Sequence, residues 1–106
     1  YLHGGAYVVG HPDAYQTLVA HIAVGKNALA IVPDYRLSPE NPFPAGQEDC
    51  LAIVKAVRGA YPEARLTVMG DSAGGGLSVA TTSAGSGTHS IERIYEVLMP
   101  GNRSML

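Results

Sequence analysis

Residues 66–76 read LTVMGDSAGGG, so a short apolar run leads directly into a cluster of small residues. Gly70, Ser72 and Gly74 fit the pattern G-x-S-x-G, in which a strand turns sharply into a helix. Such a turn strains the serine backbone and leaves no room for side chains at the flanking positions. It also exposes the hydroxyl at a helix N-terminus, where developing negative charge is favoured. The pattern predicts that Ser72 is a nucleophile; the alternative is a serine that only caps a helix.

The rest of the chain alternates between helical and strand-like patterns. The first helix is expected to follow Asp13 as a cap and to stop at Gly25. Pro44 is a favourable first residue for the second helix. Continuous apolar runs are typical of strands buried on both faces. The expected elements are a strand stub at the start, helices at 14–24, 44–58 and 73–84, and strands at 28–32 and 66–69.

Alternation of short strands and helices predicts an α/β fold. Its sheet would be parallel with helices on both faces, which makes a three-layer sandwich. Ligands bind at the carboxyl ends of the strands in such sheets. The turns at Gly4, Asp34 and Gly70 each follow a predicted strand. We therefore expect these turns to share one edge of the sheet.

Composition excludes several classes of function. The chain has 106 residues, of which 46% are hydrophobic, and a net charge of −2, which suits a globular domain and not a nucleic-acid partner. Cys50 is the only cysteine and is expected to be a buried small hydrophobe, so no intrachain disulfide or thiolate zinc cage is possible. The four histidines lack metal-ligand spacing, and nothing implies a cofactor. No apolar run reaches the ~20 residues of a membrane span, and no signal peptide is visible, so a cytoplasmic location is favoured.

A second glycine-rich turn stands near the start of the chain. It reads His3-Gly4-Gly5-Ala6 and follows the strand stub. Consecutive glycines allow backbone N–H groups to converge on one point, as an oxyanion hole requires. A lone motif of this kind would indicate only a tight turn. Its pairing with the serine turn about seventy residues later favours the catalytic interpretation.

Three motifs together resemble the hormone-sensitive-lipase-like carboxylesterases of the α/β-hydrolase fold. They are YLHGGA at residues 1–6, DYRLSPE at 34–40 followed by PFPA at 42–45, and GDSAGG at 70–75. The resemblance covers about residues 1–84, which would be the hydrolase core from oxyanion loop to nucleophile helix. Beyond it, residues 85–106 are expected to diverge. They read as a linker and a charged amphipathic turn where the family has an apolar strand, and one hypothesis is a non-native or frameshifted tail.

The resemblance implies a role for each matching residue. Ser72 would be the nucleophile, and the N–H groups of Gly5, Ala6 and Ala73 would form the oxyanion hole. Ala6 stands where the family has a third glycine, which is tolerable if its φ is negative. The supporting residues would be Gly4, which permits the close turn; His3, which shapes the loop without acting as base; Gly70, Asp71 and Gly74 of the serine motif; and Glu40, which either bonds near the oxyanion turn or is a solvated carboxylate.

The acid and the base of a catalytic triad have no good candidates. In this fold the order is serine, then acid, then histidine. Only His89, Glu92 and Glu96 follow Ser72 as candidates, and His89 precedes both glutamates. Residue 1 is moreover Tyr1 and not methionine. We therefore expect this chain to be an internal piece of a larger hydrolase whose acid and base lie outside it.

The expected function is that of a serine carboxylic-ester hydrolase. It would act on short- to medium-chain acyl esters through an acyl-enzyme, with a small-molecule ester as its only implied partner. The isolated chain is expected to fold marginally and to be inactive. Two alternatives remain open: a non-catalytic receptor-like protein of the same fold that binds a small molecule, and an amidase or formamidase.

Overall fold

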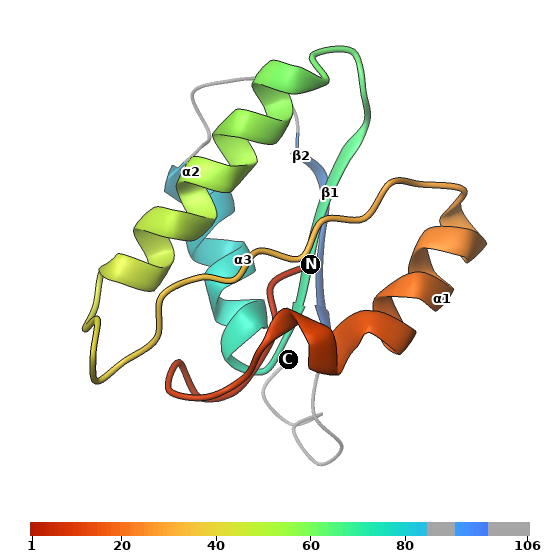
Figure 1. Cartoon of the computed structure of the whole chain (residues 1–106). Helices are drawn as coiled ribbons and strands as arrows, with labels where there is room; N and C mark the ends of the chain where they lie inside the picture. Colours follow the sequence, from red (N-terminus) through yellow and green to blue (C-terminus); the bar gives the residue numbers. More distant parts are fainter. Residues whose placement is uncertain (85–90, 98–106) are drawn as a thin grey trace, which may run out of the picture.

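A computed structural model describes residues 1–84 and the backbone of residues 91–97, as Figure 1 shows. The predicted 85–90 linker with His89, and residues 98–106, lie outside the described residues. In chain order the elements are the 3-10 helix η1 (Pro12–Tyr15), helix α1 (Gln16–Lys26), helix α2 (Ala45–Ala60), strand β1 (Leu66–Asp71), helix α3 (Ala73–Ala84) and strand β2 (Ile91–Val97).

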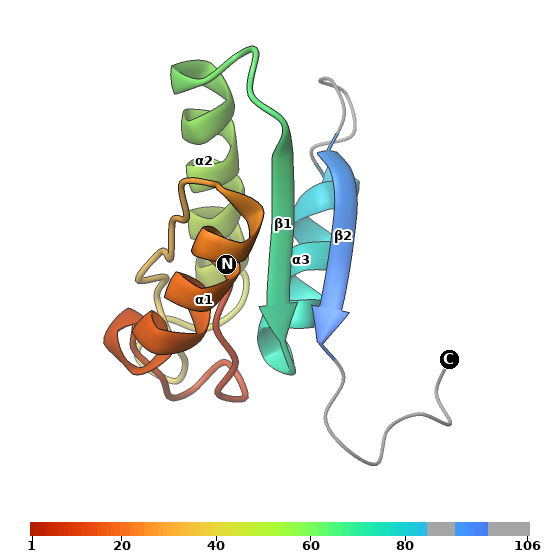
Figure 2. The ribbon, with the colours of Figure 1, turned by 90° about the vertical axis from the view of Figure 1, so that its right-hand side faces the viewer.

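Strand β1 has neighbours on both of its edges. It pairs in parallel with β2 on one edge (Figure 2). Leu2 forms an isolated parallel bridge with Gly70, and its N–H donates to the Met69 carbonyl at 2.8 Å. The Tyr1 nitrogen in turn donates to the Ile31 carbonyl at 2.8 Å. The order across these segments is therefore the 28–32 run, the strand stub, β1 and β2.

Two predicted elements differ from the structure. The 28–32 run is extended but forms no regular strand, and Leu29 is 72% exposed where burial on both faces was expected. Among the described residues its backbone link to the stub is the single bond at Ile31, so the apolar run has no continuous ladder to bury it. Residues 91–97 form β2 and not the expected helical turn, because parallel pairing with β1 overrides the local amphipathic spacing.

The helix ends also depart from prediction in their details. His11, not Asp13, caps the first turn, because its Nδ1 accepts the Asp13 N–H at 3.2 Å. Helix α1 runs past Gly25 to Lys26 and ends at Asn27, whose φ of 49° is left-handed. Asparagine tolerates that conformation, so it replaces glycine as the terminator. The third helix occupies Ala73–Ala84, as predicted.

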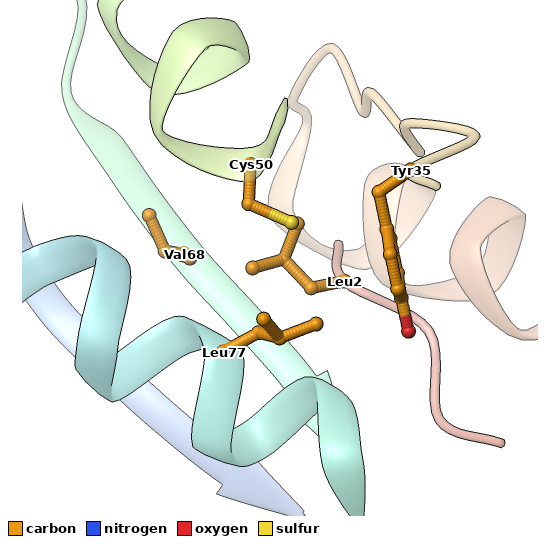
Figure 3. Packing of buried hydrophobic residues seen from close by; sticks show 5 residues of the cluster. All are labelled: Leu2, Tyr35, Cys50, Val68 and Leu77. Carbon is orange, nitrogen blue, oxygen red and sulfur yellow. The ribbon is translucent and has the colours of Figure 1, made fainter. Parts of the chain in front are cut away.

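The core lies between β1 and the two helices on one of its sides. Helices α2 and α3 are on this side and α1 is on the other (Figure 1). Figure 3 shows the cluster itself, in which side chains from the stub, the 34–40 loop, both helices and β1 meet. Cys50 is fully buried, as predicted, and burial raises the pKa of its thiol to about 11, which makes it a packing residue. The cluster consists of Leu2, Tyr35, Cys50, Val68 and Leu77.

Candidate active site

The turn between β1 and α3 has the strained geometry that the sequence predicts. Ser72 has a φ of 50° and is exposed to solvent. A Cβ at Gly70 would stand 2.6 Å from the Leu2 carbonyl oxygen. A Cβ at Gly74 would lie 2.7 Å from the carbonyl carbon of Leu2 and 2.9 Å from that of His3. Gly74 is therefore needed because the strand stub passes directly over it, and Gly70 because the backbone of Gly74 and the stub both lie against it.

Asp71 joins the serine turn to the first glycine-rich turn. Its Oδ1 accepts the Gly4 N–H at 3.0 Å, although the two residues are 67 positions apart. The same oxygen accepts the Tyr1 hydroxyl at 2.8 Å. A Cβ at Gly4 would stand 2.8 Å from the Asp71 carbonyl oxygen. The structure thus brings together the two motifs that were predicted to share one edge.

The N–H groups predicted to hold an oxyanion have no hydrogen-bond partner in the part of the chain that the structure describes. Within the described residues, no hydrogen bond is donated by the backbone of Gly5, Ala6 or Ala73. Ala73 is the first residue of α3, where an N–H has no partner within the helix. Gly5 has a φ of 130° and Ala6 a φ of 54°. The condition that would make alanine tolerable here, a negative φ, is not met: the turn places Ala6 in the left-handed region, which costs about 1–2 kcal/mol.

Three aromatic rings surround the oxyanion turn. The fully buried His3 ring stacks between Tyr35, at a centroid distance of 4.5 Å, and Tyr15, at 5.4 Å. The hydroxyl of Tyr35 donates to the His3 carbonyl, and that of Tyr15 to the Gly4 carbonyl at 3.4 Å. The ring of Tyr1 packs 5.8 Å from Tyr15. Sequence reasoning missed Tyr15, because it reads as an ordinary apolar residue of a helix and belongs to no motif.

The hydroxyls of these tyrosines remain protonated over a wide range of pH. Desolvation is the largest cause and raises the pKa of Tyr1, Tyr15 and Tyr35 above the ordinary value. The carboxylate of Asp71 also contributes to each rise. All three side chains therefore stay hydrogen-bond donors beside the turn at neutral pH.

The 34–40 loop supports the oxyanion turn from the outside. The N–H of Ser38 donates to the Tyr7 carbonyl at 2.8 Å. Arg36 binds both oxygens of Asp49 at 2.9–3.1 Å, which fixes the loop to α2 and lowers the pKa of the Asp49 carboxyl. Glu40 is exposed and, within the described residues, makes no hydrogen bond to the turn. This exposure agrees with a solvated carboxylate, and the role of Glu40 stays a prediction.

An apolar cavity of about 350 Å³ opens beside the oxyanion turn. It lies between that turn, the residues that lead into α2, and the first turns of α3. Among the described residues no cluster of potential metal ligands exists, and none of the helices described is long and apolar enough to cross a bilayer. Four of the residues that line the cavity lie in or next to the two glycine motifs: Ala6, Tyr7, Gly76 and Leu77. Phe43 and Pro44, which precede α2 in the chain, line it as well.

A strained, exposed serine after a parallel strand, in a turn that contacts a glycine-rich turn, is the arrangement of an α/β hydrolase. The profile of a family described as having the alpha/beta hydrolase fold matches residues 1–101. The chain belongs to this family, and its relatives place it among the hormone-sensitive-lipase-like members.

Two curated relatives and one solved structure illustrate the similarity. An acetyl-hydrolase of Streptomyces hygroscopicus is 40% identical over 85 residues, which are 79% of this chain and 28% of that protein. The carboxylesterase NlhH of Mycobacterium tuberculosis is 40% identical over 84 residues, covering 74% of this chain and 26% of the relative. The hormone-sensitive-lipase homologue EstE7 from a metagenome library superimposes with a TM-score of 0.84 at 37% identity, covering 92% of this chain and 34% of EstE7. The chain therefore spans less than a third of the curated relatives' length.

Proposed function

We propose that the protein carrying this chain is a serine carboxylesterase for short- to medium-chain acyl esters. The observation that carries this proposal is the pairing of the strained Ser72 with the N–H groups of Gly5, Ala6 and Ala73, which donate no hydrogen bond among the described residues. The relatives support it, because their names include a carboxylesterase and an acetyl-hydrolase. The apolar cavity beside Ala6 suits the hydrocarbon part of an ester.

The proposed reaction proceeds through an acyl-enzyme. The Ser72 oxygen attacks the ester carbonyl carbon while a histidine base accepts the hydroxyl proton. The carbonyl oxygen becomes an oxyanion, which the N–H groups of Gly5, Ala6 and Ala73 stabilise. The intermediate collapses, and the leaving alcohol takes the proton from the histidine. Water then attacks the acyl-enzyme in the same way and releases the carboxylic acid and the free serine.

The remaining parts of the hydrolase belong to the proposal as well. The base and its acid partner would come from chain outside these 106 residues, since the order of His89, Glu92 and Glu96 does not suit this fold. In the whole protein, the segments beside β1 would be part of a wider parallel sheet with helices on both faces. Without these parts the isolated chain would have little or no activity.

A Ser72→Ala variant of the whole protein tests the proposal. We expect wild-type protein to hydrolyse p-nitrophenyl acetate and the variant to lose this activity, because no other group of the turn can form the acyl-enzyme. The matched control is Ser83→Ala, an exposed serine at the far end of α3. After the wild-type protein has reacted with an alkyl phosphonate inhibitor, mass spectrometry should find the phosphonate bound to Ser72. A wild-type protein that binds but never cleaves esters would favour the receptor-like alternative, and preferential cleavage of anilides would favour the amidase.

A further inference from the structure

We propose that Tyr15 is a positioning residue for the oxyanion hole, acting through the carbonyl of Gly4. This inference rests on the proposed function and deepens it. Tyr15 touches none of the reacting atoms, and no motif of the sequence includes it. Its hydroxyl and its ring nevertheless both contact the groups that set the direction of the Gly5 N–H.

The argument begins with the planarity of one peptide bond. The carbonyl of Gly4 and the N–H of Gly5 belong to the same peptide, and in a trans peptide they point in opposite directions. Whatever holds the Gly4 oxygen therefore aims the Gly5 hydrogen. Among the described residues two groups hold it: the Nδ1–H of His3 at 2.7 Å and, at the longer distance of 3.4 Å, the Tyr15 hydroxyl. The Gly5 N–H is thus directed away from them, and it carries no hydrogen bond within the described residues.

The imidazole itself needs support, because its ring can rotate. Tyr35 and Tyr15 stack on its two faces, with interplanar angles of 21° and 28°. The Nε2 atom of His3 is buried and has no hydrogen-bond partner among the described residues, so no polar contact fixes that end of the ring. The hydrogen bond to the Gly4 carbonyl holds the Nδ1 edge of the ring, and the two aromatic neighbours support the rest of it. Gly10 also lies close to the ring, since a Cβ there would stand 2.6 Å from the His3 Nδ1.

Tyr15 is the better of the two neighbours for an experiment. Tyr35 is 2% exposed and belongs to the core cluster, so its loss would disturb the fold as well as the loop. Tyr15 is only half-buried and lies where η1 meets α1, so its backbone is held by two short helical segments. Replacing its side chain removes the stack and the hydroxyl while the core cluster stays intact.

The test uses the whole protein with Tyr15→Leu and Tyr15→Phe, and Tyr61→Leu as the matched control at an exposed tyrosine. For Tyr15→Leu we expect kcat to fall about 10- to 100-fold, because an oxyanion donor acts mainly on the transition state. The KM should stay within about twofold of wild type. The inhibition constant of an alkyl trifluoromethyl ketone, which forms an oxyanion on the serine, should rise by the same factor as kcat falls. Tyr15→Phe keeps the ring and should lose about threefold in kcat.

The outcomes separate this inference from the proposed function. A folded Tyr15→Leu protein whose kcat and ketone inhibition match wild type would overturn the role of Tyr15, as would an effect confined to KM. If Tyr15→Leu does not fold, Tyr15→Phe decides: a loss in kcat at unchanged Tm supports the inference, and wild-type kcat refutes it. The proposed function fails instead if wild-type hydrolysis does not depend on Ser72.

Discussion

Replacement of Gly74 by alanine tests how closely the strand stub lies on the serine turn. The new Cβ would stand 2.7 Å from the carbonyl carbon of Leu2 and 2.9 Å from that of His3. Carbon atoms normally approach to about 3.5–4.0 Å, so these two contacts alone require the backbones to separate by about 0.6–1.3 Å. The carbonyl oxygen of Leu2 lies nearer still to the new Cβ and requires a larger separation. The displaced His3 carbonyl is bonded directly to Gly4, so the oxyanion turn would move with it.

The expected consequences concern both activity and stability. A displacement of about 1 Å at a catalytic group lowers kcat/KM by about 100-fold. Forcing a methyl group into this packed contact should lower the free energy of unfolding by about 1–3 kcal/mol. Hydrolysis of p-nitrophenyl acetate and urea unfolding of the whole protein measure the two effects.

Gly59→Ala is the matched control for Gly74→Ala. Gly59 lies in α2, and a Cβ there would meet nothing within 4 Å. This substitution should leave activity unchanged and raise the free energy of unfolding by about 0.5–1 kcal/mol, because alanine favours the helix. If Gly74→Ala keeps wild-type kcat/KM and behaves like Gly59→Ala in urea, the stub does not lie on the turn and the reasoning is refuted.

Two further predictions concern pH. Burial raises the pKa of Tyr35, so its contribution to stability is complete below about pH 10 and is lost as pH rises toward the folded-state pKa. The free energy of unfolding should therefore fall above pH 10, and it should fall less steeply with pH in Tyr35→Phe than in the wild type. Equal pH slopes for the two proteins would contradict this prediction. Arg36 lowers the pKa of Asp49, so this ion pair stabilises the fold above the ordinary carboxyl pKa and is lost as pH falls through the lowered one. Asp49→Asn should be less stable than wild type at pH 6 and equal to it near pH 2, and a difference that persists in acid would count against the ion pair.

The parts that sequence predicted well are those dictated by backbone sterics. The serine turn requires glycine at fixed positions, so the pattern of Gly70 and Gly74 predicted the geometry of the turn. The bounds of α3 followed, because the turn defines where the helix starts. Contact between the two glycine motifs was also predictable, since the ends of adjacent parallel strands share an edge.

The parts that sequence did not predict depend on distant contacts. The positive φ of Ala6 is imposed by the turn as a whole, and an alanine gives no local sign of it. Strand β2 forms because β1 offers an edge, although its residues read as an amphipathic turn. Tyr15 contacts the oxyanion turn by stacking on His3 and by its bond to the Gly4 carbonyl, and no local periodicity indicates such contacts. The catalytic roles of these residues remain predictions.

The contact over Gly74 has a consequence for how sequence variation can act on this site. The atoms that a Cβ would strike at Gly74 belong to the main chain of Leu2 and His3, and every residue type has those atoms. No smaller side chain elsewhere could make room, so second-site suppressors of Gly74→Ala should not arise at either position. Homologous chains can therefore differ in the side chains around this turn. Glycine at position 74 cannot be replaced, because no substitution elsewhere would remove the main-chain atoms that a Cβ would strike.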